Sequence, residues 1–128
     1  MKIVNGTLTV PVDTFVVGTL YAEEKSFNIQ HQEQPDKRLI YGVLEGPEHA
    51  VYTRGRTEGD IIELPQEWEW LIDLKSITVS LTPVGHYQSV YVKEIKDNAV
   101  FLHSDDLIDC YYLIQATRKD IPKLQIIQ

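Results

Sequence analysis

Histidine and cysteine side chains are the first candidates for chemistry, because imidazole and thiolate groups bind metals and act as bases or nucleophiles. The chain contains His31, His49, His86 and His103. No two of them lie within five residues of each other, and no H-x-x-x-H or C-x-x-C spacing occurs. The single cysteine, Cys110, stands in an apolar run, where a cysteine is typically a small buried side chain. We therefore expect no metal, no cofactor and no catalytic thiol.

Paired carboxylates are the second candidate, because glycoside hydrolysis needs two of them facing each other across a cleft. Glu45 and Glu48 flank a Gly-Pro turn, and Asp105 and Asp106 follow a strand-like run. Acidic residues in turns are typical of a solvated surface, and the chain has no G-x-S-x-G motif and no phosphate-binding glycine loop. The sequence therefore predicts a protein that is not an enzyme, with a small glycan hydrolase as an alternative.

Two arginines are the third candidate. Arg54 and Arg56 stand on either side of Gly55, so a strand would place both guanidinium groups on one face. On an acidic chain, this pair predicts charge-assisted contacts with a neighbouring subunit or particle. The alternative is an ion pair within the chain, with Glu45, Glu48 or Glu58 as partner.

Aromatic residues are divided between two faces of their elements. Trp68 and Trp70 are two residues apart on a predicted helix, so only one of them can face the core, and Trp70 is a candidate interface residue. Tyr111 and Tyr112 point to opposite faces of a predicted strand. The outward ring fits sugar stacking or subunit packing equally well.

The composition is that of one ordinary globular domain. The chain has 128 residues, of which 43% are hydrophobic and 24% charged, and this length supports a core without disulfides. Nineteen acidic and twelve basic residues give a net charge of −7, which argues against nucleic acid and anionic membranes as partners. No stretch resembles a signal peptide or a membrane span, so we expect synthesis in a cytoplasm.

Period-two alternation is the strongest structural signal and is clearest at residues 77–82, I-T-V-S-L-T. Further β-rich runs, separated by turn residues, cover 8–12, 15–21, 26–29, 39–44, 50–54, 61–64, 89–95, 99–103 and 109–117. This pattern predicts an all-β fold, an antiparallel β-sandwich that is jelly-roll-like. Residues 65–74 predict one short helix, and the polar stretch 30–38 predicts an exposed loop.

Turn residues indicate how the C-terminal strands connect. The stretch 83–86, P-V-G-H, predicts a hairpin between 77–82 and 89–95, and Asp97-Asn98 predicts a tight hairpin between 89–96 and 99–103. With residues 109–117 these strands would form an antiparallel meander.

The N-terminal segment is predicted to lie outside the sandwich domain. Residues 1–24 are predicted to form an arm or edge strand that contacts a neighbour, with Val10 and Val12 as interface candidates. Pro11 favours an edge position because proline cannot donate to a ladder. Residues 25–128 are predicted to form the sandwich domain.

Several motifs in fixed order resemble a domain found at the C-terminal ends of tail-fibre and other virion structural proteins of tailed phages, closest to those of cyanophages. They are L-E-G-P-E at 44–48, V-Y-T-R-G at 51–55, I-E-L-P at 62–65 with Trp68, the run S-I-T-V-S-L-T-P-V-G at 76–85, and R-K-D at 118–120. The resemblance covers residues 25–124. The motif residues are architectural: glycine permits reversals, and proline fixes φ and ends strands. They are Gly46, Pro47, Pro65, Pro83 and Gly85.

The resemblance implies a non-enzymatic virion protein, a homotrimer located on the virion after synthesis in the host cytoplasm. The stalk that precedes the domain in fibre proteins is missing ahead of residue 25. This departure favours a capsid decoration (cement) protein that binds the major capsid protein or another virion protein through its N-terminal segment. A tail-fibre tip or baseplate adaptor that binds host surface sugar is the alternative.

Overall fold

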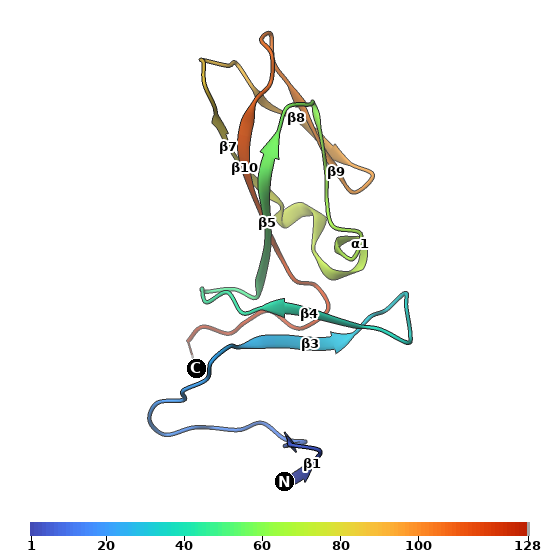
Figure 1. Cartoon of the computed structure of the whole chain (residues 1–128), viewed down its shortest axis with the longest axis vertical. Helices are drawn as coiled ribbons and strands as arrows, with labels where there is room; N and C mark the ends of the chain where they lie inside the picture. Colours follow the sequence, from blue (N-terminus) through green and yellow to red (C-terminus); the bar gives the residue numbers. More distant parts are fainter. Residues whose placement is uncertain (128) are drawn as a thin grey trace.

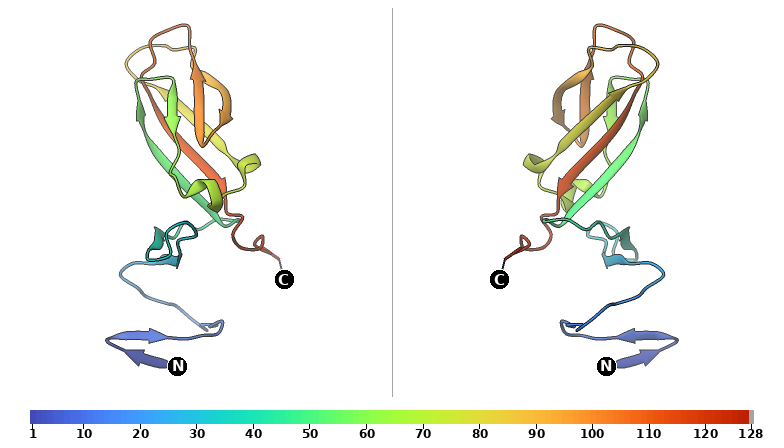
Figure 2. Two further views of the ribbon diagram at one scale, coloured as in Figure 1. Left: turned by 90° about the vertical axis from the view of Figure 1, so that its right-hand side faces the viewer. Right: turned by 90° about the vertical axis from the view of Figure 1, so that its left-hand side faces the viewer.

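Alternation of apolar and polar side chains produces two three-stranded antiparallel sheets that pack face to face (Figures 1 and 2). The computed structural model describes residues 1–127. The fold is all-β and sandwich-like, as predicted, although its two sheets have fewer strands than the eight of a full jelly roll. No helix within residues 1–127 has the length and apolar character needed to cross a membrane.

The first sheet has the order β5 (Ala50–Thr57), β10 (Cys110–Thr117), β7 (Thr78–Pro83). In the central strand β10, Cys110, Ile114 and Ala116 are buried and Tyr112 faces the same side, while Tyr111, Leu113 and Gln115 face outward. Ile114 lies between Thr53 of β5 and Val79 of β7. The inner side of this sheet therefore forms one wall of the core.

The second sheet has the order β6 (Ile61–Glu63), β9 (Ala99–His103), β8 (Tyr91–Lys96). The hairpin β8–β9 is confirmed, and its turn residues Asp97 and Asn98 have φ values of 52° and 53°. Positive φ at both positions fits the right-handed twist of the flanking strands, and Asp and Asn tolerate it well. Val100 and Leu102 of β9 face the core.

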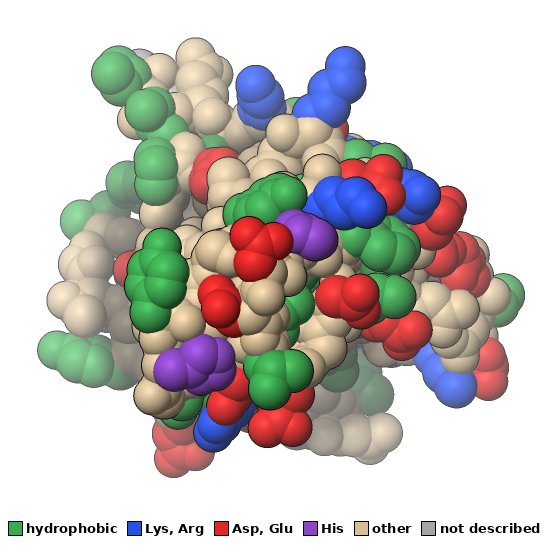
Figure 3. Space-filling view, turned by 90° about the horizontal axis from the view of Figure 1, so that it is seen from above, with side chains coloured by type: hydrophobic (Ala, Val, Ile, Leu, Met, Phe, Trp, Pro, Cys, Tyr) green, Lys and Arg blue, Asp and Glu red, His purple; other side chains and the backbone are tan. Residues whose placement is uncertain are grey.

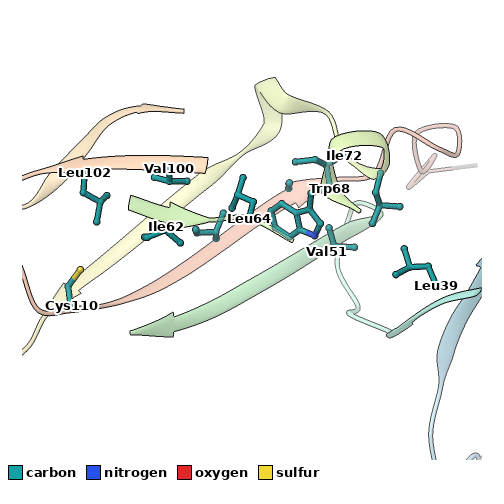
Figure 4. Close-up of a cluster of buried hydrophobic side chains, with 12 residues drawn as sticks. Leu39, Val51, Ile62, Leu64, Trp68, Ile72, Val100, Leu102 and Cys110 are labelled. Carbon is teal, nitrogen blue, oxygen red and sulfur yellow. The ribbon is translucent and has the colours of Figure 1, made fainter. Parts of the chain in front are cut away.

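In the part of the chain that the structure describes, helical structure is confined to α1 (Trp68–Leu71) and one 3-10 turn, η1 (Leu74–Ser76), inside the predicted helix region and just beyond it. Pro65 follows β6, and its carbonyl accepts the first helical hydrogen bond, from Trp68 N. Trp68, Leu71 and Ile72 share one face and are fully buried, as their spacing predicts. Together they close one end of the core between the sheets, as Figure 4 shows for Trp68 and Ile72.

A separate hairpin, β3 (Ser26–Gln30) and β4 (Arg38–Gly42), packs against this helical end (Figure 1). Leu39 adds to the buried cluster (Figure 4). Trp68 Nε1 donates to Tyr41 Oη at 3.2 Å, and Tyr41 in turn donates to Glu67 Oε1 at 2.5 Å. The hairpin is thus fixed by its apolar side chains, chiefly Leu39, and by this chain of hydrogen bonds. Its loop, residues 31–37, lies at the surface as predicted.

The Arg118 side chain contacts the same face of this hairpin through Phe27. Its guanidinium lies 4.1 Å from the centre of the Phe27 ring, and Phe27 stacks on Tyr41. Arg118 also forms an ion pair with Asp120 in which both side chains are less than 10% exposed. The C-terminal segment after β10 therefore holds β3 in place.

The first 26 residues are all exposed. β1 (Lys2–Val4) and β2 (Thr7–Thr9) form a small hairpin turned by Asn5 and Gly6, both at positive φ. The predicted strand at 15–21 is wrong and that at 8–12 is wrong beyond Thr9, because β-rich composition forms no strand without a neighbour to pair with. The arm, residues 1–24, extends away from the sandwich (Figure 2).

The predicted hairpin between residues 77–82 and 89–95 is wrong, and so is the meander. β7 and β8 lie in different sheets, joined by residues 84–90, and β10 pairs with β5 and β7 instead of β9. The turn signal at Pro83 and Gly85 is real, since Gly85 has a φ of 81°. A proline and a glycine mark a reversal, but they do not distinguish a hairpin from a connection that crosses between layers.

Candidate functional site

The outer face of the β5–β10–β7 sheet presents three rows of exposed side chains, each row crossing the sheet. The rows are Arg56–Tyr111–Thr82, Arg54–Leu113–Ser80 and Tyr52–Gln115–Thr78. A hollow of about 710 Å³ lies over the first two rows. The face combines two guanidinium groups, an aromatic ring and the hydroxyl groups that follow one another along β7. These groups can bind a ligand, but none of them is placed as a nucleophile with an adjacent base.

Arg56 is engaged within its own chain. Its Nε and Nη2 atoms donate to the two carboxylate oxygens of Asp109 at 2.7 and 2.8 Å, in the parallel geometry that guanidinium and carboxylate groups favour. This hydrogen-bonded pair raises the pKa of Arg56 and lowers the pKa of Asp109. The partner is none of Glu45, Glu48 or Glu58, so that part of the sequence prediction is wrong.

Arg54 differs from Arg56 because, among residues 1–127, it makes no ion pair and no side-chain hydrogen bond. It is exposed on the row next to Leu113. Its guanidinium is therefore available to a partner, and the predicted contact with a neighbouring subunit or particle stays a prediction for Arg54.

A second hollow, which we call the edge groove, has a volume of about 580 Å³ and meets the first at Arg54. Its lining comes from two segments of the chain, Ile40–Leu44 and Ala50–Arg54. Because inward-facing Val51 and Thr53 and outward-facing Tyr52 all contribute, the groove follows the edge of β5 rather than one face of the sheet. Among the described residues, 1–127, β5 has a partner strand only on the β10 side.

Gly55 has a structural role that its sequence position alone does not reveal. A Cβ atom at Gly55 would lie 2.7 Å from Tyr112 Oη and 2.9 Å from Tyr112 Cζ. Tyr112 stands directly opposite Gly55 on the inner face, so its ring lies across β5 where a side chain would otherwise be. The glycine between the two arginines is therefore needed for packing beneath the outer face.

The carboxylates of the hydrolase alternative lie at opposite ends of the sandwich. Glu45 pairs with Lys25 at 2.8 Å, which lowers the pKa of Glu45, and Glu48 accepts from Thr117 Oγ1 at 2.8 Å. Asp106 accepts from Ser89 N at the end where β10 begins. An eight-residue strand spans roughly 23 Å. These groups therefore cannot act together on one glycosidic bond.

The histidines and Cys110 do not form a common site. Within residues 1–127, no three His, Cys, Asp or Glu side chains lie close enough together to hold a metal ion. His31 Nδ1 accepts backbone hydrogen bonds in its own loop, and His86 Nε2 contacts the Leu107 carbonyl. Cys110 is fully buried, and burial raises the pKa of its thiol. A protonated buried thiol is a poor nucleophile.

The remaining predicted site residues lie in three places. Trp70 is half-buried against the His31 ring, 5.5 Å between centroids, and its Nε1 is buried without a partner among the described residues. Gly46 does not adopt positive φ, and with Pro47 it lies in the loop before β5. Val10 and Val12 are exposed on the arm.

The end of the sandwich farthest from the arm is built by residues 84–90 and 104–109. Buried Gln88 joins them, donating to Val84 O and Asp109 O and accepting from Asp109 N. Tyr87 and Leu107 are each 86% exposed there. Figure 3 looks onto this end and shows acidic side chains beside histidines. Neither Gln88 nor Tyr87 is predictable as a site residue from the sequence, because isolated polar and aromatic residues in a loop carry no pattern.

Comparison of the chain with protein-family models, curated proteins and solved structures found no match. The resemblance to virion domains of tailed phages stays a prediction from the sequence motifs.

Proposed function

We propose that this chain is a non-enzymatic structural protein of a tailed-phage particle, trimeric and bound to the particle surface as a decoration protein through its N-terminal arm. The arm would bind another virion protein, most directly the major capsid protein. The sandwich would then project from the particle.

The observation that carries the proposal is the exposure of the apolar arm. Phe15 is 91% exposed and Val17 is 90% exposed, and neither belongs to a helix or strand. Contiguous apolar surface of this kind marks an interaction site. An extended arm that docks on a partner would remove it from water, as in other cases of strand addition.

Two further features support the proposal. The sequence motifs at residues 44–55 and 76–85 resemble those of virion domains. Gly46, Pro47, Pro83 and Gly85 of these motifs lie in connections or at a strand end, in keeping with an architectural role. In addition, the carboxylates available for hydrolysis are far apart, which favours binding over catalysis.

The test is to purify particles of the phage that encodes the chain and locate the protein by mass spectrometry and cryo-electron microscopy. We expect stoichiometric copies on the capsid and loss of the protein from particles when residues 2–24 are deleted. Absence of the chain from purified particles would overturn the proposal.

A second candidate, a tail-fibre tip or adaptor that binds host surface sugar, is favoured by the outer face. The exposed Tyr111 ring offers a stacking surface, and Ser80 and Thr82 offer hydroxyls beside Arg54. Location at the tail, together with glycan binding that Tyr111→Ala abolishes, would favour this candidate over capsid decoration.

A further inference from the structure

The free edge of β5 is an unfilled position in the sheet. In the described part of the chain, only β10 hydrogen-bonds to the backbone of Ala50–Thr57. In an antiparallel ladder every second residue directs its N–H and C=O groups away from its partner strand. Along β5 these groups face the edge groove or solvent, and they can pair with one more extended segment.

The edge groove is suited to an apolar segment that carries negative charge. Ile40, Val43 and Leu44 line one side of it, and all three are exposed. Arg54, which lacks an ion pair within residues 1–127, lies at its far end. The groove therefore offers an apolar wall and one uncompensated cation.

The arm contains a segment of matching character at residues 12–17, V-D-T-F-V-V. Val12, Phe15 and Val17 are among the most exposed apolar residues of the chain. Four of the six residues are β-branched, which favours strands, and Asp13 is the only charged residue in the segment. Six extended residues span roughly 20 Å, which is within the length of the eight-residue strand β5.

We propose that residues 12–17 of one copy add as a fourth strand to the free edge of β5 in a second copy. The arm leaves the sandwich at Lys25. The carbonyl of Lys25 accepts a hydrogen bond from Val43 N at 3.2 Å, and its ammonium group forms an ion pair with Glu45. From there the arm runs away from its own β5 edge (Figures 1 and 2). In this direction the arm can reach a second copy of the chain. To dock on the β5 edge of its own copy, the arm would have to reverse direction.

This arrangement deepens the proposed function by naming the partner of one part of the arm. Each copy donates one arm and accepts one, so the contact is head-to-tail, and the proposed trimer is the ring in which the third arm returns to the first copy. The β1–β2 hairpin at the start of the arm then stays available for the particle.

Light scattering on the purified full chain tests the oligomer. We expect a trimer, three times the 14.7 kDa of one chain. Phe15→Asp should weaken assembly at least tenfold without unfolding the sandwich, which Phe15 does not contact. Tyr87→Asp is the matched control because Tyr87 is similarly exposed but lies at the far end. A monomeric full chain, or an oligomer insensitive to Phe15→Asp, would overturn the inference.

Mixing two defective variants tests the arm-to-edge contact itself. Phe15→Asp has a defective arm and an intact edge, whereas Ile40→Asp has an intact arm and a defective edge groove. Each alone should be monomeric, and a one-to-one mixture should form a heterodimer because one good arm meets one good edge. A mixture that stays monomeric would exclude arm donation. A chain found on particles as a monomer would refute this inference and the trimeric state but leave the decoration role standing, whereas an arm-dependent trimer absent from particles would refute the decoration role and leave this inference standing.

Discussion

At the residue scale, the tightest packing constraint is that between Gly55 and the Tyr112 ring. The Cβ of an alanine at position 55 would lie within 3 Å of two Tyr112 atoms, so the ring or β5 must move. We expect Gly55→Ala to lower the free energy of unfolding by about 1–3 kcal/mol, the range for overpacked sites. Denaturant unfolding measures this. Gly59→Ala is the control because a Cβ there meets nothing within 4 Å, and an equal loss in both variants would contradict the explanation.

Tyr41 links the hairpin to the helix through a buried hydrogen bond. Tyr41→Phe removes the acceptor of Trp68 Nε1 and leaves a buried donor unsatisfied. We expect a loss of about 1–3 kcal/mol in urea unfolding, the cost of an unpaired buried polar group. Tyr52→Phe, at an exposed tyrosine, should change stability little. Burial and the neighbouring Glu67 raise the pKa of Tyr41, so its hydroxyl stays protonated at neutral pH.

The Arg56–Asp109 pair makes stability depend on pH in a defined direction. Arg56 lowers the pKa of Asp109 in the folded state, so the folded chain holds this proton less tightly than the unfolded chain. The stabilisation is present above the unfolded pKa of about 3.9 and is lost as the pH falls through the folded value. We expect Asp109→Asn to be less stable than the parent at pH 7 and equally stable at the acid end. Thermal melts across this pH range would refute the assignment if the difference persisted in acid.

At the element scale, local patterns predicted the strands of the sandwich and the β8–β9 pairing, but not the pairings between strands distant in the sequence. The alternation at residues 77–82 and 109–117 appears as β7 and β10, and Asp97-Asn98 turns the β8–β9 hairpin. The pairing of β10 with β5 joins residues more than fifty positions apart, and no local pattern encodes it. The sequence neighbours β7 and β8 instead lie in opposite sheets, because each places its apolar side on the shared core.

The candidate site shows the same division between local and long-range information. Period-two spacing placed Arg54 and Arg56 on one face, which the structure bears out. It could not reveal Asp109 as the partner of Arg56, since the two are 53 residues apart. The edge groove likewise depends on the position of β4 beside β5, which follows from tertiary packing of Leu39 and Tyr41.

At the scale of the whole molecule, the arm and the sandwich are independent in packing. Residues 1–24 are exposed throughout, so removing Met1–Val10 takes no side chain from the core. We expect this deletion to leave the melting temperature of the isolated monomer unchanged and to weaken particle binding. Differential scanning calorimetry of dilute protein measures the first effect and co-sedimentation with particles the second. Unfolding of the truncated chain would show that the segment belongs to the domain.

The central position of β10 has a consequence for how the protein is made. Its partners β5 and β7 are synthesised before β10. They do not pair with each other, because β10 lies between them in the sheet. The sheet therefore cannot assemble while residues 110–117 are still within the exit tunnel. Sheets that depend on such distant pairings fold slowly. During synthesis the apolar faces of β5 and β7 are thus exposed to chaperones until β10 has left the exit tunnel and can pair with them.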